Sequence, residues 1–294
     1  TYDVRGNKTY EGGATYPVRY GFDIYGNRTS MTTYRNEASG TGDTTTWLVD
    51  EASGLVTQKV YADGNGTAYD YDANGRLVKR TWARGIETDY TYNGFGNLTR
   101  TDYSDGTPSV VIAYDALGRK ASVTDVKGTT TYAYDAFGRR VRKETSEATT
   151  TYVYDGWNLV REEIAGTNGT TDVIEYYWGK DISGSLDTAG GIGGLLYLKR
   201  NGAVYVPLYD ASGNVTAYVD AAGNVVATFA YDAFGNTVAE DGTLAGVFRF
   251  KYSTKYHDAE TGLVYYGYRF YAPAHARWLT PDPLEEQGGL NLYA

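Results

Sequence analysis

A short motif recurs along the chain at a nearly constant spacing. It consists of an aromatic residue, usually Tyr, followed by Asp, two further residues, Gly, and Asn or Arg. From Asp50, the Asp-equivalent positions are 50, 72, 93, 115, 135 and 155, so the steps are 22, 21, 22, 20 and 20 residues. Further copies begin at Tyr209 and Tyr231, and looser ones at Phe22, Val49, Tyr154 and Val219. Such a period indicates a repeat architecture built from one supersecondary unit.

The copy around Asp135 predicts what each unit is. Residues 129–134 alternate with a period of two, which is typical of a strand with Thr130, Tyr132 and Tyr134 on one face. Asp135 to Gly138 has turn chemistry, because Asp can cap its own backbone and Gly accepts a positive φ. Residues 139–145 then form the returning strand. Because a lone hairpin is marginally stable in water, we expect consecutive hairpins to stack into one antiparallel sheet.

The composition agrees with this all-β prediction and excludes several functions. Tyr (31) and Gly (37) are abundant among 294 residues, as aromatic strands with tight turns require. The chain has no Cys and two His, so we expect neither thiol chemistry nor a metal site, and no motif indicates a cofactor. A net charge of −9 argues against nucleic acid as a partner. The sequence contains no apolar stretch long enough for a membrane span.

The repeat pattern changes in two places. The repeat becomes irregular between Gly166 and Gly202. After Gly246 the sequence is dense in aromatic residues and contains both His. We therefore predict a repeat sheet over residues 1–246 and a separate closing segment, called the core segment below, over residues 247–294. The start at Thr1, within the pattern, favours a piece of something longer.

The Tyr-Asp copies and the core segment together resemble an Rhs or YD-repeat protein. The most specific stretches of the core segment are Asp258-Ala259-Glu260-Thr261-Gly262-Leu263 through Tyr271, and Arg277-Trp278-Leu279-Thr280-Pro281-Asp282-Pro283. They resemble the Rhs-associated core that closes the repeat region. The resemblance implies a curled sheet of hairpins that forms part or all of a hollow β-shell, with the core segment plugging or capping one end.

The resemblance also implies a function. In toxin members of the family the shell encloses a C-terminal effector, so we expect a structural carrier of a secreted or surface-exposed bacterial polymorphic toxin. Its partners would be its own effector domain, which this sequence lacks, and secretion-system or cell-surface proteins. Eukaryotic relatives act in adhesion, so a cell-surface adhesion or glycan-binding module is the alternative.

An aspartyl autoprotease is the second alternative that the resemblance implies. Asp282 would be one of its two carboxylates, and Asp258, or else Glu260, would be the other. Paired carboxylates suit this chemistry because one can act as base while the other carries the proton. The purely structural interpretation is that Pro281-Asp282-Pro283 is a rigid turn. The expected cleavage motif would lie beyond residue 294, so no cleavage is expected in this fragment.

Other candidate motifs have simpler explanations. Repeat aspartates such as Asp115, Asp135 and Asp232 cap turns. The glycine run 190–194 lacks the Lys and Ser/Thr of a phosphate loop and indicates a bend. His257 beside Asp258 has no accompanying nucleophile motif. The five Trp are spread along the sequence, which favours core packing over a sugar-binding platform.

Overall fold

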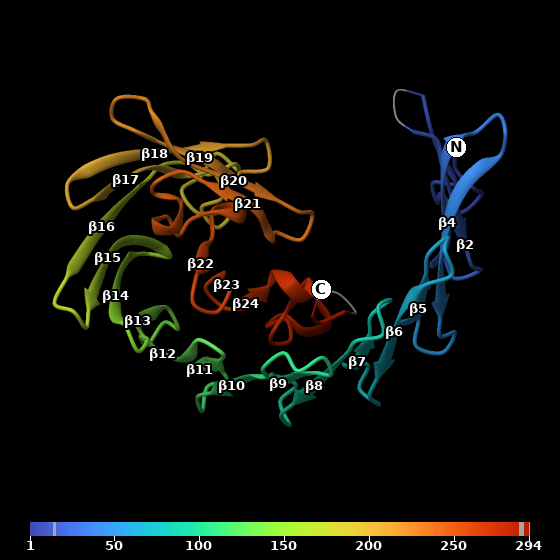
Figure 1. Ribbon diagram of the computed structural model, residues 1–294, viewed down its shortest axis with the longest axis horizontal. Helices are drawn as coiled ribbons and strands as arrows, with labels where there is room; N and C mark the ends of the chain where they lie inside the picture. The colour runs from blue at the N-terminus through green and yellow to red at the C-terminus, as the bar shows by residue number, and fades with distance from the viewer. Residues whose placement is uncertain (14–15, 288–290, 294) are drawn as a thin grey trace. The chain divides into compact units, whose positions relative to one another are not determined.

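The computed structural model describes residues 1–13, 16–287 and 291–293, and these are almost entirely strands and turns. The chain divides into two compact units. The first comprises Thr1–Tyr92 and Thr99–Ser109, and the second comprises Asn93–Leu98 and Val110–Ala294. The predicted fold of repeated antiparallel hairpins is confirmed (Figure 1). The predicted boundary at residue 246 lies inside the second unit and stays a prediction, and residues 288–290 and 294 of the core segment lie outside the described part.

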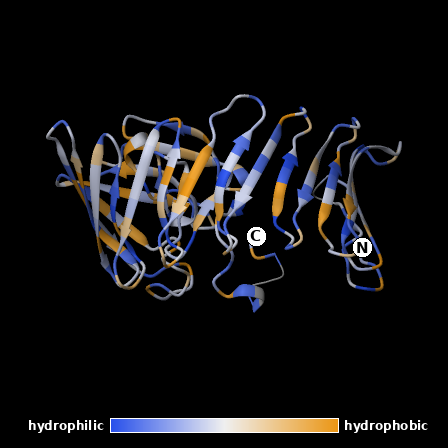
Figure 2. Cartoon of the chain, turned by 90° about the horizontal axis from the view of Figure 1, so that it is seen from below, coloured by the Kyte–Doolittle hydropathy of each residue, from blue (hydrophilic) through white to orange (hydrophobic). Residues whose placement is uncertain are grey.

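The first unit is a run of hairpins in which the strands from β1 to β8 pair antiparallel in chain order. Hydrophobic and hydrophilic residues are interspersed along individual strands (Figure 2). Most side chains here are half-buried, whereas Thr67, Thr88 and Tyr90 are buried. The strands are β1 (Tyr10–Glu11), β2 (Val18–Phe22), β3 (Arg28–Asn36), β4 (Thr41–Val49), β5 (Val56–Val60), β6 (Gly66–Tyr71), β7 (Leu77–Thr81), β8 (Glu87–Tyr92) and β9 (Leu98–Tyr103).

The second unit continues the same pattern from β10 to β21, again with antiparallel pairing in chain order. Its sheet curls strongly, so that it has a concave and a convex face (Figure 1). The strands are β10 (Val110–Tyr114), β11 (Lys120–Asp125), β12 (Gly128–Tyr134), β13 (Arg140–Glu144), β14 (Ala148–Asp155), β15 (Asn158–Gly166), β16 (Thr171–Trp178), β17 (Leu195–Arg200), β18 (Ala203–Tyr209), β19 (Val215–Asp220), β20 (Val225–Tyr231) and β21 (Thr237–Asp241).

Each turn of the repeat is held by its Asp. Asp135 Oδ1 accepts the backbone N–H groups of Phe137 and Arg139 at 2.9 Å each, and Oδ2 accepts Arg139 Nε at 2.8 Å. Gly138 has a φ of 83°, which a residue with a Cβ adopts only at a cost. These contacts confirm the predicted turn chemistry and explain why Arg or Asn closes the motif, because either side chain can donate to the second carboxylate oxygen.

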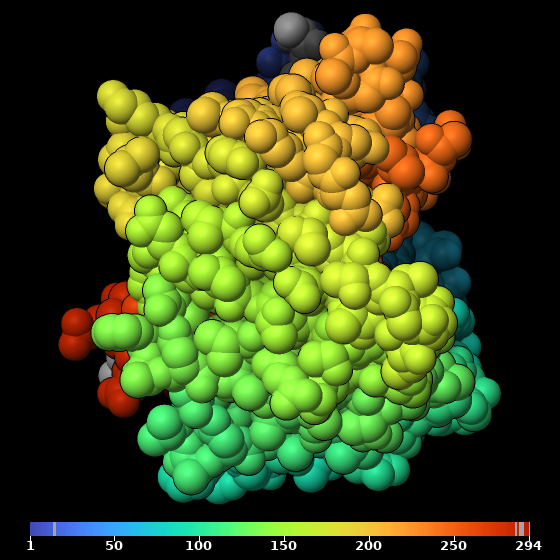
Figure 3. Space-filling view, turned by 90° about the vertical axis from the view of Figure 1, so that its left-hand side faces the viewer, coloured from blue at the N-terminus to red at the C-terminus, as the bar shows by residue number. Residues whose placement is uncertain are grey.

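The core segment lies on the concave side of β10–β21 (Figure 1). In the view onto the convex face, the strands form a continuous surface and the red end of the chain is visible only at its edge (Figure 3). The segment contains a small antiparallel sheet of β22–β25. The short helix η1 (Ala245–Val247) leads into the segment. Its own elements are η2 (Tyr252–Thr254), β22 (Tyr256–Asp258), β23 (Leu263–Tyr265), β24 (Phe270–Ala272), η3 (Pro273–His275), β25 (Arg277–Trp278) and η4 (Glu285–Gln287).

Aromatic packing joins the core segment to the sheet. Phe248 stacks on Tyr218 at 3.9 Å between ring centroids, and Phe250 meets Tyr176 edge-on at 4.9 Å. Phe270 lies 5.7 Å from Tyr132. These three tyrosines of the sheet therefore face inward, and the hydrophobic core of the second unit lies between its concave face and the core segment.

Candidate functional site

The concave face carries a buried cluster of charges where it meets the core segment. Arg140 on β13 and Asp258 on β22 are each 0% exposed, and Arg140 Nη1 lies 2.6 Å from Asp258 Oδ2. Lys143 Nζ lies 3.3 Å from Asp258 Oδ1 and 2.9 Å from Glu260 Oε2. Asp258 and Glu260 of the core segment are thus bound by two cations of the sheet.

A break in strand register brings both cations to the same face. The pairing of β12 with β13 shifts between Ala133 and Tyr134, directly before the turn. Tyr134 then faces Arg140 and Tyr132 faces Lys143, so residues three apart on β13 are both buried. In a regular strand they would point to opposite faces. The same spacing of buried residues recurs at Lys120 and Val123, Leu159 and Glu162, and Leu195 and Leu198.

The electrostatics of the cluster favour the ionised form of Asp258. Burial alone would raise the pKa of this carboxyl, but the charges of Arg140 and Lys143 outweigh burial and hold its pKa below the usual range. Burial, together with the neighbouring charges of Arg140 and Lys143, lowers the pKa of the Lys120 amine well below its ordinary value. Lys120 Nζ lies over the ring of Phe270, at 3.2 Å from its centroid. The cluster suits a permanent electrostatic anchor between sheet and core segment.

A second buried carboxylate lies on the same face. Glu162 on β15 is 0% exposed and accepts a hydrogen bond of 2.7 Å from the Tyr256 hydroxyl. It also accepts one from the hydroxyl of Tyr176. Since Tyr256 belongs to the core segment, this carboxylate is a second polar link between the sheet and that segment.

The predicted carboxylate pair occupies two separate ion pairs. Asp282 Oδ2 lies 2.8 Å from Arg269 Nη2, and its Oδ1 accepts the backbone N–H of Leu284 at 2.8 Å. Asp258 is bound to Arg140 and Lys143, as described above. Asp282 thus holds a turn in the present arrangement, and its side chain is 19% exposed.

The other candidates from the sequence, His257 and the glycine run, lie in environments that a structural role explains. Burial lowers the pKa of His257 to about 3, so its ring is neutral at physiological pH. The glycine run 190–194 follows a loop in which Asp181 accepts the N–H groups of Ala189 and Gly191, at 2.7 and 3.2 Å. In the part of the chain that the structure describes, no group of three His, Asp or Glu is placed to hold a metal ion. No helix within that part is long and apolar enough to cross a membrane.

Sequence reasoning missed Arg140, Lys143 and Glu162, although the repeats contain a signal for them. The residue two after the turn glycine is Leu98, Leu195 or Val215 elsewhere in the chain, and all three are buried. Lys120 and Arg140 occupy this core position with a charge. Aligning the copies by the turn would have indicated an ionic partner on the concave face.

Two families match the chain. Residues 50–85, 71–108 and 114–149 match the RHS Repeat family, and residues 189–288 match the Teneurin YD-shell family. The chain is therefore an Rhs/YD-repeat protein. Its first match covers hairpins of the repeat region, and the second covers the later hairpins together with most of the core segment.

The relatives include a tRNA nuclease and a toxin subunit. The tRNA3(Ser)-specific nuclease WapA of Bacillus spizizenii is 30% identical over 284 residues, which is 94% of this chain and 10% of that protein. Toxin subunit YenC2 of Yersinia entomophaga is 41% identical over 78 residues, which is 26% of this chain and 8% of the subunit. The chain thus spans a tenth or less of the length of these relatives.

A solved structure has a similar fold. The crystal structure of TcdB2-TccC3 aligns with a TM-score of 0.50 and 19% identity, over 100% of this chain and 19% of the solved one. At this identity the likeness supports the curled hairpin fold and not a shared activity.

Proposed function

We propose that this chain is a section of the β-shell of a secreted bacterial toxin carrier. The observation that carries the proposal is the concave face of the second unit, which encloses polypeptide of the same chain through buried ionic and aromatic contacts. The similarity to the toxin subunit YenC2 and to the nuclease WapA supports it. The cargo would be an effector domain of the same protein, held behind the sheet until delivery.

Protease protection tests the carrier function. The gene product, extended beyond residue 294 to its own end, is treated with a protease beside the separately expressed C-terminal domain. We expect the C-terminal domain to resist digestion in the long chain and to be degraded when alone. Equal digestion of the two forms would overturn the carrier and favour a solid adhesion module.

We also propose that the core segment supplies an autoprotease in the longer protein, with Asp282 and Asp258 as its two carboxylates. Asp258 is kept ionised by Arg140 and Lys143, which suits the member of the pair that accepts a proton. Asp282 would be the second carboxylate once a downstream segment displaces Arg269. This arrangement requires the core segment to rearrange when the cleavage motif binds.

Intact mass spectrometry of the extended protein tests the autoprotease. The parent is expected to split into two pieces, whereas Asp282→Asn and Asp258→Asn stay whole. Arg269→Gln is the matched control, because it removes the same ion pair but keeps the carboxylate of Asp282. If Arg269→Gln also stays whole while folded, the ion pair and not the carboxylate is what cleavage needs. A parent that stays whole overturns the autoprotease and leaves the carrier proposal intact.

A further inference from the structure

Hairpins of the first unit repeat the register that places Lys143 on the concave face of the second unit. In β13, Lys143 is the fifth residue after the turn glycine and lies opposite a tyrosine, beside a shift of register. Lys59 on β5 is likewise the fifth residue after its turn glycine and lies opposite Trp47 beside such a shift. Arg80 on β7 repeats this placement opposite Tyr69. Lys59 and Arg80 therefore belong to the face that the second unit turns toward its core segment.

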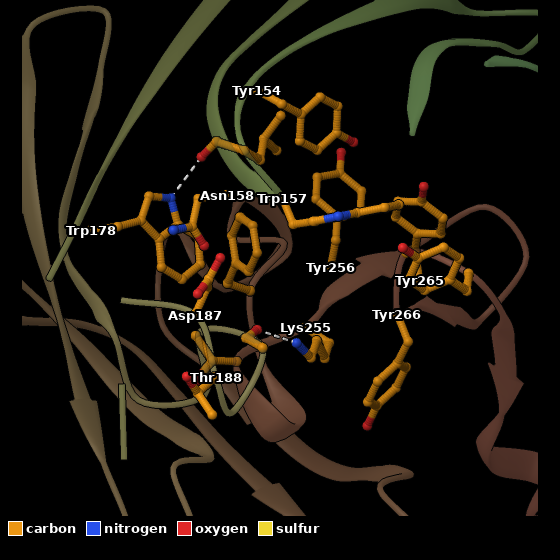
Figure 4. A pocket seen from close by; sticks show the side chains of 16 residues that line it. Tyr154, Trp157, Asn158, Trp178, Asp187, Thr188, Lys255, Tyr256, Tyr265 and Tyr266 are labelled. Atoms are coloured by element: carbon orange, nitrogen blue, oxygen red, sulfur yellow. Dashed lines mark hydrogen bonds between the residues drawn. The ribbon is translucent and has the colours of Figure 1, made fainter. Parts of the chain in front are cut away.

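In the second unit this face is covered. Lys143 is 2% exposed, and its Nζ lies 3.3 Å from Asp258 Oδ1 and 2.9 Å from Glu260 Oε2 of the core segment. Aromatic side chains accompany the ion pairs, and nearby they line a pocket of about 350 Å³ to which Trp178 of the sheet and Tyr256 of the core segment both contribute (Figure 4). The cover of this face thus supplies carboxylates to the cation and rings to the aromatic residues.

The equivalent face of the first unit, called the basic face below, carries cations that meet aromatic rings only. Lys59 Nζ lies over the rings of Trp47 and Tyr61, at 5.8 and 4.8 Å from their centroids. Arg80 Cζ lies 3.5 Å from the centroid of the Trp82 ring. Arg80 Nε is buried without a hydrogen-bond partner among the described residues, and within that part of the chain neither cation forms an ion pair. A buried donor of this kind favours a partner that is still to bind.

The carboxylates of β5 to β8 lie on the opposite face of the first unit. Lys79 precedes Arg80 and points the other way, and its Nζ lies 2.8 Å from Glu87 and 3.6 Å from Asp89. Asp70 lies opposite Lys79 in the register of β6 and β7. One face therefore balances its own charges, whereas the basic face is positive although the chain has a net charge of −9.

The rings of the basic face are held in place and border a pocket. Trp82 Nε1 donates a hydrogen bond of 2.9 Å to Thr88 Oγ1. Arg28, Trp47 and Val56 line a pocket of about 200 Å³, and Arg28 Cζ lies 4.6 Å from the centroid of the Trp47 ring. A pocket with aromatic, aliphatic and cationic walls suits an apolar side chain that has a carboxylate beside it.

These features restrict what can cover the basic face. Nucleic acid is disfavoured, because the chain as a whole has a net charge of −9. A basic or purely apolar polypeptide would cover Lys59 and Arg80 without a counter-charge. An acidic polypeptide with apolar or aromatic side chains would pair both cations and fill the pocket, as the core segment does for Lys143 in the second unit.

The path of the core segment indicates where such a polypeptide originates. The segment passes along the second unit against the order of its strands. Phe248 packs on β19, Asp258 binds β13, and the Leu279 carbonyl accepts the backbone N–H of Leu98 on β9 at 3.1 Å. The remaining residues of β9, 99–103, belong to the first unit. The core segment has thus reached the strand that the two units share.

We propose that an acidic segment following residue 294 in the longer protein continues this path and covers the basic face, with its carboxylates on Lys59 and Arg80. The inference rests on the proposed function in that both need a longer chain, and it adds a binding face and the charge that its ligand carries. The residues that follow position 294 in the gene should accordingly include Asp or Glu beside apolar residues.

Hydrogen exchange of two forms tests the proposal: the purified chain, and the gene product extended to its own end. Lys59→Gln and Arg80→Gln are made in each form. Both forms lose the ring contacts of the cation, so the difference between the forms isolates the downstream segment. We expect each variant to speed exchange of the β5–β8 amides by about tenfold more in the extended protein, where a carboxylate loses its cation.

Lys79→Gln is the matched control, because Lys79 is the neighbour of Arg80 and its partners Glu87 and Asp89 are present in both forms. Its effect on exchange should be the same in both. Equal effects of Lys59→Gln and Arg80→Gln in the two forms would overturn the proposal, and so would a downstream sequence without Asp or Glu. The two cations lie in different hairpins, so Lys59→Gln still tests the cover if Arg80→Gln unfolds.

The result is separable from the protease-protection test of the carrier. A C-terminal domain that is digested in the extended protein, together with the expected difference in exchange, would overturn the carrier and support the acidic cover. A protected C-terminal domain without that difference would support the carrier and overturn the acidic cover.

Discussion

The Tyr134 hydroxyl donates a hydrogen bond of 2.8 Å to the backbone carbonyl of Lys120, in the hairpin that precedes its own. The same link recurs from one hairpin to the previous one along both units. Its members are Tyr71 to Val56, Tyr92 to Leu77, Tyr114 to Leu98, Tyr209 to Leu195, and Tyr231 to Val215. This explains why the motif uses Tyr and not Phe, because the ring packs in the sheet while the hydroxyl pairs a carbonyl beside the register shift.

Tyr134→Phe should therefore destabilise the chain by about 1 kcal/mol, since it removes one hydrogen bond and leaves the Lys120 carbonyl without this donor. The apparent melting temperature of the purified chain measures the effect. Tyr25→Phe is the control, because Tyr25 is 68% exposed at an earlier turn. Equal melting temperatures of Tyr134→Phe and Tyr25→Phe would show that the hydroxyl link does not contribute to stability.

Asp258→Asn should cost much more, roughly 3–5 kcal/mol, because Arg140 and Lys143 would remain buried without their shared carboxylate. Thermal unfolding and hydrogen exchange of the core segment report the loss. The exposed pair of Arg35 and Asp43 provides the comparison, and Asp43→Asn should change stability by less than about 1 kcal/mol. Similar effects for the two aspartates would contradict an anchoring role for Asp258.

The ion pair also predicts a dependence on pH. The pKa of Asp258 is lower in the folded chain than in the unfolded chain, where a carboxyl titrates near about 4. The contribution of the ionised Asp258 to stability is therefore fully present above about pH 4. It is lost progressively as the pH falls toward the pKa of Asp258 in the folded chain. The difference in melting temperature between the parent and Asp258→Asn should narrow below about pH 4. A constant difference from pH 7 to pH 3 would argue against this linkage.

The sequence predicts the hairpins well because their determinants are local. Asp135, Gly138 and Arg139 lie within one turn, and each of their contacts can be inferred from residue chemistry alone. The inward tyrosine face of β12 follows from its period of two, and Tyr132 and Thr130 are buried as that period requires.

The anchor could not be predicted in the same way. Arg140 and Asp258 are 118 residues apart, and the register shift before the turn changes which side chains of β13 face inward. A strict alternation places Arg140 and Lys143 on opposite faces, so the sequence pattern alone conceals their common partner. The contact between Trp157 and Tyr268 is hidden for a similar reason, because the two rings meet only when the core segment packs on the sheet.

Gly138 and Gly242 both have a positive φ, but they would lose stability on substitution for different reasons. At Gly138 the reason is the backbone conformation, and at Gly242 it is also the close packing. Gly138 has a φ of 83° and open space where a Cβ would stand, so Gly138→Ala should cost roughly 1–2 kcal/mol, the strain of the left-handed conformation. Gly242 has a φ of 111°, and a Cβ there would collide with the Val226 carbonyl oxygen. Gly242→Ala should therefore lower the melting temperature further than Gly138→Ala does, because backbone atoms of β20 would have to move. Gly138→Asn is the control, since Asn tolerates this conformation better than Ala and should recover part of the loss. If the two alanine variants have the same melting temperature, the close approach at Gly242 does not constrain the fold.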